Sequence, residues 1–299
     1  MTRFLARHGR GLVGITIAGL VIVAAVAAPL LVPHDPLQSD FAAGLRPPGT
    51  PGHPLGTDQL GRDLLARVLY GARIALFIGV CCVLLTAIVG GLLGLLAGYF
   101  EGWAGAVLMR VAVGLLAFPG GVNISPVEID AVLMRLADVQ LSFPFILLAL
   151  TINAIVGLGL RNIIVSLSVA GWVVYARVVR GEVLSVKERD FVHAAQALGL
   201  GRGRLLFRHV LPNVTPSIVI LASLQFAQFI VAEAAISFLG FGVQPPTPPW
   251  GSMLSESRDY LYVAWWLAAF PGAALALTAL GINLVGDWLR DVLDPRFRV

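Results

Sequence analysis

The residues of this chain that are capable of catalysis do not form a catalytic motif. Lys187 is the only lysine among the 299 residues, and Val186 precedes it, so the chain has no Gly-Lys-Ser/Thr phosphate-binding loop and does not hydrolyse ATP by that route. Ser217 and Ser237 lack the Gly-x-Ser-x-Gly context of a hydrolase nucleophile, and we expect each hydroxyl to bond its own helix backbone. No catalytic residue is therefore predicted.

Metal-ligating residues are scattered along the chain. No two histidines have the i, i+4 spacing of a helical zinc site; they are His8, His34, His53, His193 and His209. Cys81 and Cys82 are adjacent within an apolar run, where a disulfide has unfavourable geometry, and we interpret them as small buried hydrophobes. The sequence predicts no metal site and no cofactor bound by this chain.

Several polar residues interrupt long apolar runs: Thr151, Asn153, Gln225, Gln228, Glu233, Asn283 and Asp287. Ionisable groups at membrane depth usually mark function, because an unpaired carboxylate in lipid is costly. Gln225, Gln228 and Glu233 are three and five residues apart near one helix face, which with Asn153 suggests a polar pathway. Two alternatives remain: these groups make structural hydrogen bonds between helices, or Glu233 and Asp287 lie at the two membrane surfaces.

Residues 190–212, DFVHAAQALGLGRGRLLFRHVLP, form a basic loop between two apolar runs. A short helix from about Arg189 is expected to end at a glycine, and Leu211-Pro212 then restarts the chain into the next apolar run. Small side chains let another protein approach, and larger apolar ones fill its pockets. The residues expected to take part are Phe191, His193, Ala194, Ala195, Leu198, Gly199, Leu211 and Pro212. An ordinary solvated basic loop is the alternative.

The composition indicates a polytopic membrane protein. Hydrophobic residues make up 58% of the chain and charged residues 13%, with a mean hydropathy of +0.86. Continuous apolar runs of about 20 residues predict transmembrane helices and not the alternating pattern of a barrel. The chain has a net charge of +4, and its positively charged residues lie at the ends of these runs. That placement is typical of residues that set membrane topology and not of a nucleic-acid interface. We expect an all-α helical bundle embedded in lipid.

Six spans are predicted, near 11–32, 74–98, 132–158, 162–180, 214–238 and 264–286. The first exceeds the apolar core of a signal peptide and is expected to be retained. With six spans, the positive-inside rule places both termini and the basic loop in the cytoplasm. Residues 33–73 and 239–262 then lie outside, where Asp58 and Asp63 are close enough to pair with some of the nearby arginines. The segment Asp63–Arg73 has the spacing of an amphipathic helix on the outer surface.

A repeat interrupts this pattern, since residues 104–119 recur loosely at 129–144 with AVLMR in both copies. The charge of Arg110 would make it costly for the first copy to cross the membrane. We therefore expect an interfacial or re-entrant hairpin that turns at Pro119-Gly120-Gly121. The expected organisation is an N-terminal region at 1–73 and a core at 74–299, with 104–128 as an extra repeated segment. Gly90 and Gly94 predict close packing of the second span.

The basic loop resembles a motif of ABC importer permeases, Glu-Ala-Ala, three residues, Gly, nine residues, Ile, one residue, Leu-Pro. Ala194, Ala195 and Gly199 match it, as does Leu211-Pro212. The chain departs from it at His193, where the motif has Glu, and at His209, where it has Ile, so no role is carried over for that acid.

Three further stretches resemble the dipeptide, oligopeptide and nickel permease family. They are LGTDQLGRD at 55–63 with GAR at 71–73, EAAISFLGFGVQPPTPPWG at 233–251, and NLVGDWLRDVLDP at 283–295. Together with the loop they cover nearly the whole chain apart from the repeat, and they are most similar to the C permeases of dipeptide systems.

The resemblance implies a type I ABC importer permease of the bacterial or archaeal cell membrane. It further implies a homologous permease partner, an extracytoplasmic substrate-binding protein and two cytoplasmic ATPases that bind ATP and Mg²⁺ and receive the loop helix. The stiff outer loop suggests contacts to the binding protein from Gln244, Pro245, Pro246 and Trp250.

Peptides are the expected cargo, with nickel or glutathione as alternatives. A stand-alone secondary transporter is the alternative from another class, and it would require its own ion-coupling carboxylates and inverted repeats.

Overall fold

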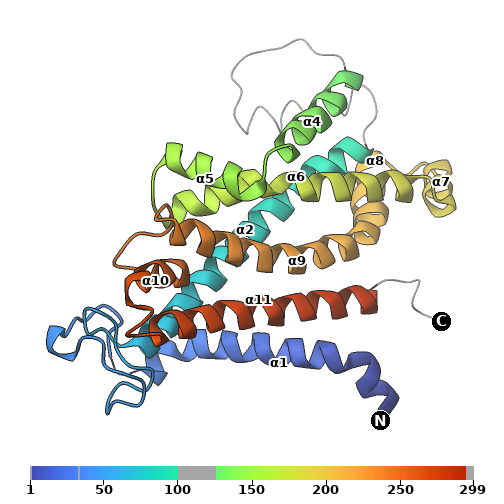
Figure 1. The fold of residues 1–299 in the computed structure, drawn as a ribbon. Coiled ribbons are helices and arrows are strands. Elements are labelled where there is room, and N and C mark those ends of the chain that lie inside the picture. Colours follow the sequence, from blue (N-terminus) through green and yellow to red (C-terminus); the bar gives the residue numbers. More distant parts are fainter. Residues whose placement is uncertain (1, 33, 100–125, 294–299) are drawn as a thin grey trace.

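The computed structural model describes residues 2–32, 34–99 and 126–293, which form long helices running side by side (Figure 1). Five helices are long and apolar enough to cross a membrane. They are α1 (Thr2–Leu31), α2 (Leu64–Tyr99), α6 (Leu160–Lys187), the helix Arg202–Phe238 that includes α9 (Leu211–Phe238), and α11 (Trp266–Leu293). The described residues contain no β-strand, which confirms the all-α bundle.

The shorter elements connect these helices at both ends. They are η1 (Phe41–Ala43), α4 (Pro126–Leu141), α5 (Phe145–Val156), α7 (Asp190–Ala197), α8 (Arg202–Leu205), η2 (Leu206–Val210), α10 (Trp250–Glu256) and η3 (Arg258–Tyr260). The repeated segment 104–128 and its expected hairpin at Pro119 lie almost wholly outside the described residues.

The third predicted span is not a continuous helix. α4 and α5 meet at an angle of 100°, and the pair gives a sixth span only if it is counted as one. Pro144, the residue before α5, lacks an N–H and its ring disfavours a helical conformation for Phe143, so the helix is interrupted there. The expectation of one unbroken helix over 132–158 was therefore wrong.

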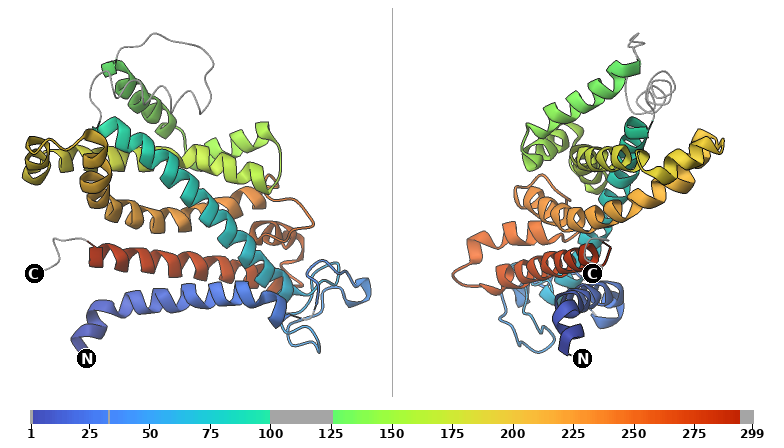
Figure 2. Two further views of the ribbon diagram at one scale, coloured as in Figure 1. Left: turned by 180° about the vertical axis from the view of Figure 1, so that it is seen from behind. Right: turned by 90° about the vertical axis from the view of Figure 1, so that its right-hand side faces the viewer.

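The bundle has two distinct ends. α1 begins and α11 ends at the end that also carries α7 and α8, whereas the segment of residues 34–63 and α10 lie at the other end (Figures 1 and 2). We call residues 34–63 the outer segment. This grouping brings the arginine-rich basic loop to the same end as the start of α1.

The helix expected over Asp63–Arg73 is present as the first turns of α2, which runs unbroken from Leu64 to Tyr99. Its 36 residues span about 54 Å at about 1.5 Å per residue, more than the about 30 Å of a bilayer core. The first turns of α2 therefore extend beyond the hydrocarbon, and the boundary at residue 73 falls inside one helix. Leu64 and Arg67 are 1% and 3% exposed because α10 and the outer segment cover them.

Glycines let α2 approach α6 closely, as predicted. A Cβ on Gly90 would lie 2.2 Å from the carbonyl oxygen of Trp172, and one on Gly94 would lie 2.4 Å from that of Ala176. Both distances are below any real Cβ contact. The two backbones therefore touch where only hydrogen fits.

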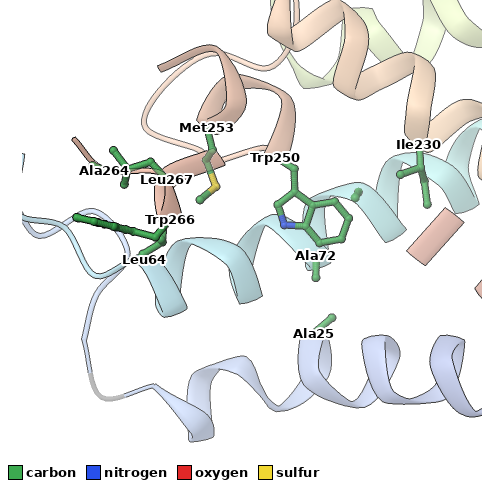
Figure 3. Close-up of a cluster of buried hydrophobic side chains, with 10 residues drawn as sticks. Ala25, Leu64, Ala72, Ile230, Trp250, Met253, Ala264, Trp266 and Leu267 are labelled. Atoms are coloured by element: carbon green, nitrogen blue, oxygen red, sulfur yellow. The ribbon is translucent and has the colours of Figure 1, made fainter. Parts of the chain in front are cut away.

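An apolar cluster joins four helices and α10 near the outer segment (Figure 3). Trp250 of α10 lies among Ala72 of α2, Ala25 of α1 and Ile230 of α9, and its Nε1 donates to the carbonyl oxygen of Val68 over 3.0 Å. A Cβ on Gly71 would lie 2.7 Å from the Trp250 ring. α10 is thus fixed against the first turns of α2.

A buried ionic cluster lies beside these residues. Asp58 Oδ2 pairs with Arg62 Nε at 2.6 Å and with Arg67 Nη1, and both arginines reach Glu256 Oε2 of α10 at 3.2 Å. Asp58 Oδ1 also accepts the backbone N–H groups of Leu60 and Arg62 at 2.9 Å. The expected pairing of Asp58 with arginines is confirmed, whereas Asp63 pairs with His53.

Gly94→Ala is expected to destabilise the protein by about 1–3 kcal/mol, because the new methyl group overpacks the α2–α6 contact. Gly91→Ala is the matched control, since a Cβ there meets nothing within 4 Å. Thermal melting of the purified protein in lipid nanodiscs measures both. Equal midpoints for the two variants would contradict the close packing.

Asp58→Asn is expected to destabilise the protein by about 3–5 kcal/mol, because it leaves Arg67 buried without its nearest counter-charge. The asparagine still accepts the two backbone hydrogen bonds, so the loss reports the charge. Glu256→Gln, whose side chain is 32% exposed, should cost less than about 1 kcal/mol. Similar melting midpoints for both variants would show that the cluster is not held by Asp58.

Candidate functional site

α7 forms a short helix that projects from the bundle at the end where α1 begins (Figure 1). Arg189 precedes its first turn, and Gly199 adopts φ +78° after its last. Gly199 N–H donates to the carbonyl oxygen of Gln196 at 2.9 Å and Leu200 N–H to that of Ala195 at 3.2 Å, the two bonds of a Schellman end. The helix predicted from Arg189 to Gly199 is confirmed.

One face of α7 packs on its own chain. Val192 and Ala195 are 0% and 7% exposed, in one apolar cluster with Val183 and Val186 of α6 and with Leu205 of α8. The helix is thereby fixed to the end of α6. Ala195 consequently serves packing within the chain.

The opposite face of α7 is open. Between residues 190 and 199, the exposed residues of the predicted set are Phe191, His193, Ala194, Leu198 and Gly199; Pro212 of the same set is also exposed, at the start of α9. Leu198 is 81% exposed and Phe191 39%, so this face presents apolar surface to its surroundings. His193 Nε2 lies 3.9 Å from Glu188 Oε2, and both side chains are more than half exposed, so this pair is weak.

The passage from the basic loop into α9 differs in detail from the prediction. Leu211 and Pro212 begin α9, but the helical path already starts at Arg202, and only the hydrogen-bond pattern changes, through a π-helical turn at η2. Pro212 has no N–H for the carbonyl four residues earlier, which favours the wider turn. Asn213 Nδ2 donates to the carbonyl oxygen of His209 at 2.7 Å.

Of the candidate pathway residues, Gln228 lines a cavity in the described part of the chain. This cavity of about 480 Å³ lies between the start of α5 and the middle of α9 and α11, and Asn283 is its other amide side chain. Asn283 was recognised as a polar residue in a span, but sequence spacing within one helix does not show that it faces Gln228 across two helices. The cavity walls are otherwise apolar.

The other pathway candidates are buried in the protein. Gln225 is 5% exposed and Glu233 1%, so Gln225, Gln228 and Glu233 do not form one accessible strip. Ser237 Oγ donates to Glu233 Oε1 at 2.6 Å, and the backbone N–H of Val243 donates to Ser237 Oγ at 3.3 Å. The expectation that Ser237 bonds its own helix backbone was therefore wrong, and the Glu233 side chain is buried inside the protein.

Asn153 also has a structural partner. Its Nδ2 donates to the carbonyl oxygen of Phe241, which ties α5 to the turn after α9. Its side chain is fully buried. This bond matches the alternative of a structural hydrogen bond between helices.

The outer loop after α9 separates into exposed and buried parts. Gln244, Pro245 and Pro246 are exposed, and Gln244 Nε2 donates to the carbonyl oxygens of Gly240 and Gly242 at 3.3 and 3.2 Å. Trp250 is 2% exposed. Its indole is therefore unavailable as a surface contact, which corrects that part of the prediction.

Known proteins resemble the chain over its whole length. The family described as binding-protein-dependent transport system inner membrane component matches residues 90–299. The di/tripeptide transport system permease protein DppC of Pseudomonas aeruginosa is 40% identical over 97% of this chain and 90% of its own length.

Two further relatives are similar to a comparable degree. The glutathione transport system permease protein GsiD of Pectobacterium atrosepticum is 38% identical over 99% of this chain and 90% of its own length. The dipeptide transport system permease protein DppC of Alkalihalophilus pseudofirmus is 37% identical over 98% of this chain and 88% of its own length. The chain therefore belongs to the family of binding-protein-dependent transport system inner membrane components, the membrane permeases of ABC transporters.

Proposed function

We propose that this permease imports peptides as one half of a pathway completed by a homologous permease. Relatives named for di/tripeptide and dipeptide transport cover nearly the whole chain at 40% and 37% identity. Two cytoplasmic ATPases bind ATP and Mg²⁺ and supply the energy, and a substrate-binding protein outside the membrane delivers the peptide.

The observation that carries the coupling is the division of α7 into an anchored and an open face. Leu198 and Phe191 present apolar side chains to a partner, while Val192 and Ala195 fix the helix to α6. A displacement of α7 by an ATPase therefore moves α6 with it. Because α6 meets α2 backbone to backbone at Gly90 and Gly94, the two helices move as one body.

The cavity beside Gln228 and Asn283 supports a role as one wall of the pathway. It opens at the side of the bundle and is not enclosed by this chain, as expected where a second permease supplies the opposite wall. Amide side chains donate and accept hydrogen bonds, which suits the backbone of a peptide. Asn153 instead ties α5 to the turn after α9, and Gln225 and Glu233 are buried.

The orientation follows from the charges and the two ends of the bundle. The end with α7 and the arginines of the basic loop faces the cytoplasm, together with both termini. The outer segment and residues 244–246 then face the binding protein. The chain resides in the cell membrane.

Glutathione is the second candidate cargo, because a relative named for glutathione transport is 38% identical over 99% of this chain. Membership of a binding-protein-dependent family disfavours the stand-alone secondary transporter.

Leu198→Glu is expected to abolish peptide uptake, because a charge at the exposed tip of α7 cannot enter an apolar pocket of the ATPase. ATP hydrolysis should no longer respond to the loaded binding protein. Uptake by proteoliposomes of the whole transporter, and ATPase activity with and without peptide, measure the effect.

Ser185→Glu is the control for this experiment, since it places a charge on an exposed residue of α6 outside α7. It should keep uptake and membrane insertion. Full uptake by the Leu198→Glu variant would remove α7 as the coupling element.

The partner binding protein is expected to melt at a higher temperature with di- or tripeptides, because a ligand that binds only the folded state stabilises it. A ligand at about 100 times its Kd stabilises by about 2.7 kcal/mol. Parallel melts with glutathione and Ni²⁺ test the alternatives. Stabilisation by Ni²⁺ alone would contradict peptide import while leaving the permease role intact.

A further inference from the structure

Three side chains with metal-ligating atoms meet in the outer segment. His34 follows α1, His53 lies within the segment, and Asp63 immediately precedes α2. One ligand atom from each lies within 4.8 Å of the others. No local spacing reveals this group, because its members are 19 and 10 residues apart along the chain.

The carboxylate of Asp63 is oriented by the helix that follows it. Its Oδ2 accepts the backbone N–H of Ala66 at 2.8 Å, which caps the first turn of α2. Its Oδ1 is directed at the imidazoles and lies 2.9 Å from His53 Nδ1. Because the helix cap fixes Oδ2, the other oxygen of the same carboxylate, Oδ1, is already oriented to bind a ligand.

His53 is also held by its backbone. Its N–H donates to the carbonyl oxygen of Thr50 at 2.8 Å, and antiparallel bridges join Thr50 to His53 and Thr57 to Asp63. Asp63 itself is 3% exposed. Two of the three ligands therefore occupy fixed positions on a folded segment.

A simple hydrogen bond between His53 and Asp63 does not explain the place of His34. Its ring centroid lies 5.2 Å from that of His53, with the planes tilted by 33°. His34 is the most exposed member of the group, so a ligand from solvent can reach its ring directly. A shared ligand accounts for both rings and the carboxylate at once.

Two imidazoles and one carboxylate are a typical ligand set for Zn²⁺ and related divalent transition metals. Such an ion holds nitrogen and oxygen ligands at about 2.0–2.2 Å, so its ligands lie at most about 4 Å apart. The ligand atoms lie within 4.8 Å of one another, and small side-chain rotations bring them into this range. An open cavity of about 580 Å³, lined by His34, Tyr70 and Arg73, leads to the group from the side of His34.

We propose that His34, His53 and Asp63 bind a divalent transition-metal ion. The ion fastens the end of α1 and the outer segment to the start of α2, because its ligands come from all three. This site is distinct from the peptide pathway, and it does not depend on the identity of the cargo.

The test uses the whole transporter purified with a tag free of histidine, stripped with a chelator and titrated with Zn²⁺ against a chromophoric competitor. The wild type is expected to bind one more Zn²⁺ per complex than the His34→Gln variant. This variant isolates the metal from the hydrogen bond, because it leaves the His53–Asp63 pair intact. Asp63→Asn retains the helix cap and should also lose the additional ion.

His209→Gln, at the other end of the bundle, is the matched control and should bind Zn²⁺ as the wild type does. Mutating an outer-shell partner of a metal ligand weakens metal binding about 10–100-fold. Loss of a ligand itself should weaken Zn²⁺ binding by at least that factor. The same addition of Zn²⁺ should raise the melting temperature of the wild type and not that of His34→Gln. Equal Zn²⁺ affinity and stoichiometry in the wild type and His34→Gln would overturn the proposal.

Discussion

The backbone contact between α2 and α6 is the interaction on which the two ends of the molecule depend. Gly90, Gly94 and Gly98 of α2 leave no room for a side chain against Trp172, Ala176 and Val183 of α6. α6 carries α7 at one end, and α2 carries the ionic cluster and the Trp250 cluster at the other. In a bilayer the lipid tails are as apolar as the helices, so such close packing provides much of the association that water would otherwise drive.

The outer end combines two kinds of contact with different physical roles. The apolar cluster around Trp250 and Met253 buries apolar surface, whereas the ion pairs of Asp58, Arg62 and Arg67 fix the orientation of the outer segment. Buried ion pairs add little net stability over an apolar core, because desolvation offsets their attraction. Here they join the outer segment to α10 through Glu256, so only one placement of the segment satisfies all four charges.

Local patterns in the sequence predicted the local structure well. The spacing of Gly90 and Gly94 predicted close packing of the second span, though not its partner α6, and Gly199 after a short basic helix predicted the end of α7, because each signal lies within a few residues. Contacts between distant segments were not predictable in this way. The burial of Trp250, the bond from Ser237 to Glu233 and the approach of Asn283 to Gln228 each depend on how separate elements pack. The start of α2 was expected to lie on the outer surface because its arginines are typical of an exposed helix face, whereas α10 covers it.

The 100° bend between α4 and α5 restricts what can surround the subunit. Residues 142–144 are exposed in the single chain, and Pro144 lines the open cavity that also holds the exposed amide side chains of Gln228 and Asn283. Hydrocarbon offers these amides no hydrogen bonds, so water or another protein must cover that side. Acyl chains are left to the far side of the bundle, where α1 shows Leu20, Val26 and Leu30 at 65%, 74% and 91% exposure. The subunit accordingly has one flank that requires water or protein and one that faces lipid. In an isolated copy surrounded by lipid, the polar groups of the first flank would lack hydrogen-bond partners.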